Sequence, residues 1–353
     1  MHFPTLVLSA LLLAGNAAAD TPLIGIAAPL TGPSGSLGQQ MRDGATAAAT
    51  AEFALDIADD ACTAAGGTNA ARKFAAAKVR IVVGFLCTEA IEAALPILKD
   101  ANIPVITIGV RTDSLTDRRE KTGWPVFRLG PRADDERMAA ATILTRLWSA
   151  ELFAIIDDGT IYGRELAESF RGAAEQAGLK PVYVDTFRPQ SDNQIGLVGR
   201  LRKAGATHVF VGGDRDDVAI MGRDAAELDA GMTFASGEAL RAAPGDVALE
   251  AGTLMIGLPD WAELAGPTAL AALAAREIAP DGYVLPAYAA IEVAMEAIAP
   301  AGQPDALPVE ALTGRDFSTA IGSVRFNEKG DLSDNLYRAF RFDGSRFVPL
   351  EVE

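Results

Sequence analysis

Groups suited to binding a carboxylate follow two short apolar segments of the chain. Thr88 comes shortly after the segment 79–86, and Gly109 and Arg111 come after 104–108. A hydroxyl beside the free N–H groups of a helix start and a planar guanidinium both bind carboxylate oxygens, and a glycine lets the backbone approach a ligand. Plain helix capping by Thr88 and solvation of Arg111 are the alternative roles. The pattern predicts one half of a binding site.

Acceptors for a ligand ammonium group follow other apolar segments. Asp214 and Glu238 come after glycines at the ends of the segments 208–212 and 232–235. Tyr162 follows a third segment, where it is placed to cover a ligand and donate a hydrogen bond. Each acid has an alternative role at a helix N-terminus, where the dipole favours a carboxylate. Carboxylate recognition in one half and ammonium recognition in the other predict a site for an α-amino acid.

Residues that support common catalytic chemistry are scarce. Beyond the first 19 residues His208 is the one histidine, and its apolar surroundings disfavour histidine-based catalysis and most histidine-containing metal sites. No phosphate-loop or dinucleotide-binding motif stands in the right context, and 32–36 (GPSGS) resembles a nucleophile elbow only loosely. We expect a binding protein without catalysis, metal or cofactor. A carboxylate-pair enzyme stays open because Asp and Glu are plentiful.

The charge balance bears on the choice of partner. The 353 residues include 31 Lys and Arg against 47 Asp and Glu, a net charge of −16 at pH 7. Nucleic-acid binders normally carry a basic footprint, and no cluster of basic residues stands out here. We therefore expect no nucleic-acid partner and no docking on an anionic membrane surface. We expect the protein to be monomeric.

The N-terminus has the pattern of a secretory signal peptide. The apolar segment 6–14 (LVLSALLLA) is too short to span a bilayer and leads to the small residues 17–19 (AAA). Lys and Arg are missing before the apolar segment, where only His2 stands. We expect cleavage after Ala19 and a periplasmic mature protein; an apolar first strand is the alternative.

Apolar segments alternate with Ala-rich helical segments through most of the chain. Several of the apolar segments are continuous, as in parallel strands covered on both faces. Repeated strand–helix–strand units predict a doubly wound α/β fold, and their number exceeds one compact sheet. The predicted strands are 23–28, 79–86, 104–108, 152–156, 182–187, 208–212, 232–235, 253–258, 324–326 and 337–342. The predicted helices include 39–53, 89–101, 133–148, 164–177, 193–204, 216–230 and 287–298.

The number of strand–helix–strand units predicts two lobes. Turn residues after strands, at 130–131 and 258–260, mark the predicted changeovers. We expect a signal peptide at 1–19, with lobe 1 formed by 20–131 and 261–325. Lobe 2 is then formed by 132–260 and 326–353.

The chain has two cysteines, Cys62 and Cys87. In an oxidising compartment two cysteines favour one disulfide, which would close a loop and stabilise the fold by about 3 kcal/mol. A pair of buried free thiols is the alternative, and spacing alone does not decide between them.

Several motifs in order along the chain carry a family resemblance. They are 24–45 (IGIAAPLTGPSGSLGQQMRDGA), 59–62 (DDAC), 83–90 (VGFLCTEA), 103–116 (IPVITIGVRTDSLT), 154–167 (AIIDDGTIYGRELA), 234–240 (FASGEAL) and 326–332 (FNEKGDL). In these motifs the sequence resembles the leucine/isoleucine/valine-binding proteins, the type I periplasmic binding proteins of branched-chain amino acid ABC transporters. The resemblance implies two doubly wound, Rossmann-like lobes joined by hinge strands, closure around the ligand, and delivery to ABC transporter permease subunits.

The resemblance also implies roles for individual residues. Cys62 and Cys87 match the family's disulfide pair. Thr88 matches the hydroxyl residue that binds the ligand carboxylate, and the Gly109 carbonyl matches the one that receives the ammonium group. The family's tyrosine and its ammonium-binding glutamate match Tyr162 and Glu238.

Three positions depart from the family pattern. Arg111 stands where a threonine is common, and Asp214 and Leu37 stand where aromatic residues often line the pocket. A buried unpaired charge is costly, so we expect Arg111 and Asp214 to have partners in the closed state, either each other across the cleft or polar groups of the ligand. The predicted ligand is therefore amino-acid-like. A ligand sensor on the same fold, or a binder of another small polar carboxylate or amide, is the alternative.

Overall fold

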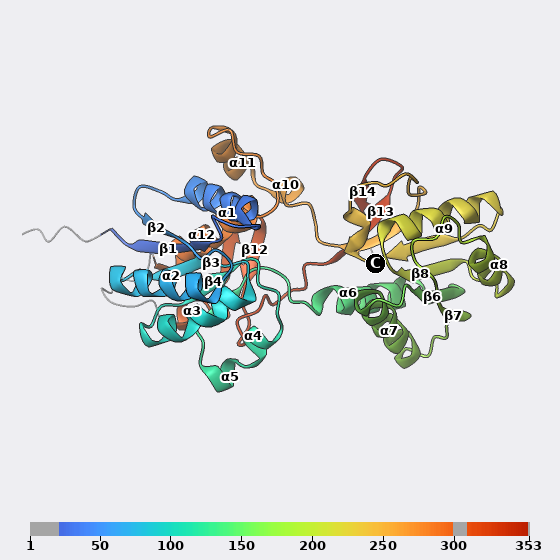
Figure 1. Ribbon diagram of the computed structural model, residues 1–353, viewed down its shortest axis with the longest axis horizontal. Coiled ribbons are helices and arrows are strands. Elements are labelled where there is room, and N and C mark those ends of the chain that lie inside the picture. Colours follow the sequence, from blue (N-terminus) through green and yellow to red (C-terminus); the bar gives the residue numbers. More distant parts are fainter. Residues whose placement is uncertain (1–20, 299–308, 352–353) are drawn as a thin grey trace, which may run out of the picture.

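The computed structural model describes residues 21–298 and 309–351 as two α/β lobes arranged end to end (Figure 1). The predicted signal peptide lies outside the described residues. No helix among the described residues is both long and apolar enough to cross a membrane.

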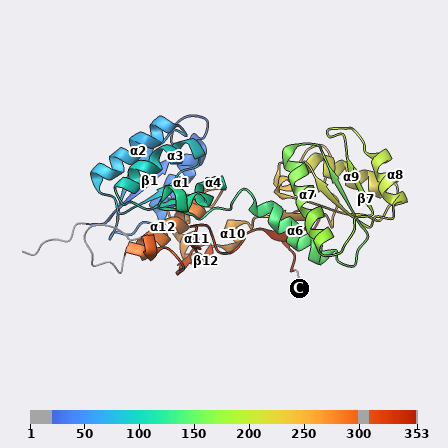
Figure 2. The same cartoon turned by 90° about the horizontal axis from the view of Figure 1, so that it is seen from below.

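Lobe 1 is built on a parallel sheet of five strands in the order β2-β1-β3-β4-β5. Helices α2 and α3 cover one face, and α1 and α12 cover the other (Figure 2). The strands are β1 (Leu23–Ala28), β2 (Ala54–Asp59), β3 (Ile81–Gly84), β4 (Val105–Thr107) and β5 (Val126–Arg128). The helices are α1 (Gly35–Ala48), α2 (Ala64–Ala77), α3 (Thr88–Asp100), α4 (Ser114–Asp117) and α5 (Arg119–Thr122).

Segments from the second half of the chain return to complete lobe 1. They are α10 (Trp261–Leu264), α11 (Pro267–Ala274), α12 (Val284–Ile298), the 3₁₀ turn η2 (Val309–Ala311), and the hairpin of β11 (Asp316–Thr319) and β12 (Gly322–Arg325). Helix α12 is buried along most of its length because its sequence is apolar on nearly every side.

Lobe 2 is built on a seven-stranded sheet in the order β14-β13-β10-β9-β8-β6-β7. Strands β6 to β10 pair with one another in parallel, and β13 and β14 add an antiparallel edge next to β10. The strands are β6 (Phe153–Asp157), β7 (Tyr183–Thr186), β8 (His208–Gly212), β9 (Thr233–Ser236), β10 (Leu254–Gly257), β13 (Arg338–Phe342) and β14 (Phe347–Pro349). The helices are α6 (Asp135–Leu147), α7 (Ile161–Gln176), α8 (Ile195–Lys203), α9 (Arg215–Glu227) and the 3₁₀ turn η1 (Glu238–Arg241).

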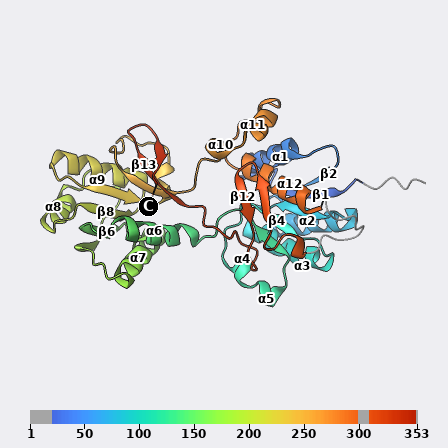
Figure 3. The same cartoon turned by 180° about the vertical axis from the view of Figure 1, so that it is seen from behind.

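Three chain segments connect the lobes, as Figures 1 and 3 show from opposite sides. The first crossing follows Leu129, which packs in the lobe 1 core, and the second follows Leu258, which packs in lobe 2. The turn residues at 130–131 and 258–260 directly follow these two leucines in the sequence or begin with them. Hinges between lobes are generally made of a few such connecting residues.

The third crossing differs from the predicted lobe boundary at residue 326. Phe326 packs in the core of lobe 1 against Phe127, with 5.3 Å between ring centroids, and against Phe317, at 6.3 Å. Leu332 also packs against this core, whereas Tyr337 belongs to the core of lobe 2. We therefore place the third crossing between Leu332 and Tyr337.

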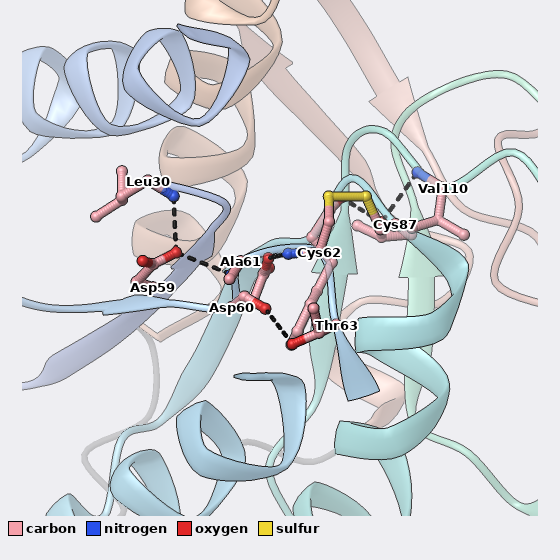
Figure 4. The surroundings of a disulfide bond; sticks show 10 residues. Leu30, Asp59, Asp60, Ala61, Cys62, Thr63, Cys87 and Val110 are labelled. Carbon is pink, nitrogen blue, oxygen red and sulfur yellow. Dashed lines mark hydrogen bonds between the residues drawn. A yellow bond between two sulfur atoms is a disulfide. The ribbon is translucent and has the colours of Figure 1, made fainter. Parts of the chain in front are cut away.

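Cys62 and Cys87 form a disulfide in lobe 1 (Figure 4). Their Cα atoms are 5.2 Å apart, and the bond joins the loop after β2 to the residue that precedes α3. The loop is shaped by Asp59, whose carboxylate accepts hydrogen bonds from the N–H groups of Leu30 and Ala61, each at 2.8 Å. The predicted disulfide is thereby confirmed.

We expect the purified protein to contain no alkylatable thiol before reduction. Reduction should lower the free energy of unfolding by about 3 kcal/mol, because it releases a loop with a sequence separation of 25 residues. Alkylation followed by mass spectrometry measures the first effect and urea unfolding measures the second. Two alkylated cysteines in unreduced periplasmic material would contradict the expectation.

Candidate functional site

Two hydroxyl groups meet at the carboxyl ends of β3 and β4 in lobe 1. Thr88 Oγ1 lies 2.7 Å from Thr112 Oγ1. Thr88 was predicted to cap helix α3, but Cys87 occupies the cap position and Thr88 is the first helical residue. The Thr112 backbone is held by Arg128, which donates to its carbonyl oxygen at 3.0 Å. Thr112 was not predicted as a site residue, although it directly follows Arg111.

The loop after β4 carries Gly109 and Arg111. A Cβ atom at Gly109 would lie 2.2 Å from the Leu86 side chain, so the residue must be small to let the loop pack here. Arg111 is exposed and donates from Nη1 to the hydroxyl of Tyr337 at 3.2 Å. This hydrogen bond joins lobe 1 to lobe 2 beside the third crossing.

A glutamate from α6 organises the other half of the site in lobe 2. Glu136 Oε1 accepts hydrogen bonds from the Tyr162 hydroxyl and from the backbone N–H of Glu238, each at 2.7 Å. Gly237 lies directly against this cluster, since a Cβ there would come within 2.2 Å of Glu136 Oε1 and 2.5 Å of the Tyr162 hydroxyl. Tyr162 and Glu238 are thus brought together by Glu136, which sequence reasoning did not identify.

Tyr337 connects this cluster to Arg111. Its hydroxyl interacts with the Glu238 carboxylate as well as with the Arg111 guanidinium. Glu238 also lies near Arg241, with 3.7 Å between Oε1 and Nε. Each carboxylate of the lobe 2 cluster therefore has a polar partner.

Asp214 lies apart from Arg111 and caps the start of α9. Its carboxylate is exposed and, within the described residues, makes no hydrogen bond or ion pair. Its neighbours are acidic: burial raises the pKa of Asp217, and the charges of Asp214 and Asp158 raise it further. Across the lobes Arg111 donates to Tyr337, and the described residues show no Arg111–Asp214 pair; the prediction of such a pair in the closed state stays a prediction.

The environment keeps both phenols protonated at neutral pH. Burial raises the pKa of Tyr162, and the Glu136 carboxylate raises it further. Burial and the Glu238 charge act in the same direction on the pKa of Tyr337. Burial also raises the pKa of Glu136, against the hydrogen bonds from Tyr162 and from the Glu238 backbone.

The arrangement consists of two polar half-sites on two lobes joined at a hinge. Lobe 1 offers two hydroxyls beside a helix start, and lobe 2 offers a carboxylate cluster. Within 21–298 and 309–351, no group of His, Cys, Asp and Glu is suitable for holding a metal ion. These features are those of a two-lobed α/β binding protein.

The chain belongs to the periplasmic binding protein family, whose family model matches residues 22–344. It is 29% identical over 346 residues to Leu/Ile/Val-binding protein homolog 3 of Brucella melitensis, covering 93% of each chain. Two solved structures share the fold. An ABC transporter substrate-binding protein from Desulfitobacterium hafniense in complex with Leu has a TM-score of 0.64 and 20% identity, covering 93% of this chain and 99% of that one. A solute-binding protein of an ABC transporter from Rhodopseudomonas palustris in complex with p-hydroxybenzoic acid has a TM-score of 0.64 and 18% identity, covering 95% and 96%.

Proposed function

We propose that this protein captures an L-amino acid between its lobes and delivers it to the permease subunits of an ABC transporter. The observation that carries the proposal is the division of the site into a hydroxyl pair, Thr88 and Thr112, and an acidic cluster around Glu238. The first suits a carboxylate and the second an ammonium group. The name of the Brucella relative, a Leu/Ile/Val-binding protein homolog, supports a branched-chain amino acid as the first ligand to test.

The ligand contacts follow from this division. Thr88 and Thr112 hold the ligand carboxylate beside the N-terminus of α3, where the helix dipole adds to their hydrogen bonds. The Gly109 carbonyl and the Glu238 carboxylate receive the ammonium group, and Tyr162 covers it. Asp214 lies at the end of β8. Strand β8 is next in the sheet to β9, which leads to Glu238. In the proposed site Asp214 faces the ligand side chain.

Closure is a rotation of the two lobes about the three crossings. A ligand that contacts both half-sites binds the closed form more tightly than the open one and shifts the population toward closure. The closed monomer then docks on the permease. In the periplasm this cycle requires export, and the pattern of 6–19 supports cleavage after Ala19.

A thermal-shift screen followed by calorimetry tests the proposal. The panel contains the twenty L-amino acids, their amides, and carboxylates that include 4-hydroxybenzoate. We expect stabilisation by one or more L-amino acids, because a ligand that binds only the folded state raises the melting temperature by mass action. Binding of carboxylates alone would reject the proposal.

A further inference from the structure

We infer that Glu136 is a positioning residue that makes the lobe 2 half-site specific for ligands with an ammonium or other N–H donor group. The inference rests on the proposed function, because it concerns the ligand bound at the same site. It starts from a single oxygen, Glu136 Oε1, which accepts from both the Tyr162 hydroxyl and the Glu238 backbone N–H at 2.7 Å.

The first consequence concerns the direction of a hydrogen bond. A tyrosine hydroxyl has one hydrogen to donate and can also accept. In Tyr162 that hydrogen is directed to Glu136, so the phenol can offer a ligand only its oxygen lone pair. We therefore infer that Tyr162 accepts from the ligand, whereas the sequence alone suggested that it donates to the ligand.

The same reasoning applies to Tyr337. Arg111 Nη1 has only hydrogens to donate, so Tyr337 accepts from it at 3.2 Å. The hydrogen of Tyr337 is then available for the Glu238 carboxylate, its other polar neighbour. The Tyr162 hydrogen is therefore used within the protein, and the Tyr337 hydroxyl has Arg111 and Glu238 as polar neighbours.

The Glu136 side chain also fixes the backbone of the lobe 2 half-site. Glu136 occupies the N–H of Glu238, the first residue of the turn η1, so this donor is not available to a ligand carboxylate. Gly237 lies directly against Glu136 and Tyr162, so a side chain at this position would displace one or both of them. Glu136, Tyr162 and the Glu238 side chain thus present acceptors to the ligand, and the hydrogens of the Tyr162 hydroxyl and the Glu238 N–H are already taken by Glu136.

The test compares L-leucine with 4-methylpentanoate, the same molecule without its ammonium group. Calorimetry gives the dissociation constants of both probes for the wild type, Glu136→Leu and Glu136→Gln. Glutamine keeps an oxygen that can accept both hydrogen bonds, whereas leucine has none. Glu165→Leu, on the exposed side of α7, is the matched control for loss of a glutamate.

We expect Glu136→Leu to weaken L-leucine binding more than tenfold and to reduce the preference for L-leucine over 4-methylpentanoate at least fivefold. Glu136→Gln should stay within about threefold of the wild type for both probes, as should the control. A purely structural loss would weaken both probes equally, so an unchanged preference in Glu136→Leu overturns the inference. A glutamine variant as impaired as the leucine variant overturns it as well.

The wild-type measurements separate this inference from the proposed function. If the wild type binds no L-amino acid, the proposed function fails and the inference fails with it. If the wild type binds L-leucine and Glu136→Leu keeps the same affinity and preference, the proposed function stands and the inference alone is rejected.

Discussion

Replacement of Glu238 by alanine is expected to weaken amino-acid binding more than tenfold. The Glu238 carboxylate lies in the acidic half-site, with partial exposure, at the start of a short 3₁₀ turn. A hydrogen bond to a charged group contributes about 1.5–3 kcal/mol, and about 1.4 kcal/mol corresponds to a factor of ten in the dissociation constant. Loss of the carboxylate also leaves the ligand ammonium without its charged partner.

Calorimetry with the amino acid found in the screen measures this effect. Because the side chain is not in the core, Glu238→Ala should fold, and circular dichroism with thermal unfolding checks that it does. Glu227→Ala, at the far end of α9, serves as a control that changes the net charge equally. Equal affinity of Glu238→Ala and the wild type would remove Glu238 from the proposed site.

Replacement of Asp331 by alanine is expected to lower the free energy of unfolding by about 3–5 kcal/mol. Asp331 is buried and accepts from Arg128 Nε at 2.8 Å, from the Thr116 hydroxyl at 2.9 Å and from Arg132 Nη1 at 3.0 Å. Arg128 is fully buried, and burial lowers its pKa against the opposing effect of Asp331. Without Asp331, the buried guanidinium loses its closest counter-charge.

An exposed pair in the same part of lobe 1 provides the control. Asp316 and Arg325 lie 3.3 Å apart with side chains 66% and 51% exposed, so Asp316→Ala should cost less than about 1 kcal/mol. Urea unfolding of both variants beside the wild type measures the difference. If the two variants lose the same stability, water or another residue replaces Asp331 and the buried pair is not a major source of stability.

The parallel architecture could be predicted because most of its strands are continuous apolar segments. Strands β2 and β5 were missed for identifiable reasons. In β2 (ALDIAD) an acidic residue interrupts the apolar run. Strand β5 (VFR) is short and ends in Arg128, and the burial of Arg128 depends on Asp331 from a distant segment of the chain. Local patterns do not show that a charged residue will find its partner far along the chain.

The prediction of site residues has the same limit, because partners distant in sequence leave no local pattern. Thr88, Tyr162 and Glu238 could be singled out because each follows an apolar segment, and the structure places Tyr162 beside Glu238. Glu136 stands in an ordinary charged helix start, and its partners are 26 and 102 residues away in sequence. No local signal marks such a residue. Thr112 could have been predicted from the sequence, because it is a hydroxyl residue that directly follows Arg111 in the same loop.

The three crossings have a consequence for how the chain folds as it emerges. Lobe 1 needs α12, whose apolar sides pack against α1 and the sheet, and lobe 2 needs β13, which pairs with β10 through contacts such as Met255 with Phe340. Both elements come late in the chain, so when the first half has been synthesised the lobe 1 sheet still lacks α12 on one face, whereas the core on its other face, under α2 and α3, is made entirely of residues before 127. Lobe 1 can therefore be half formed, but not complete, before the C-terminal segments have been synthesised.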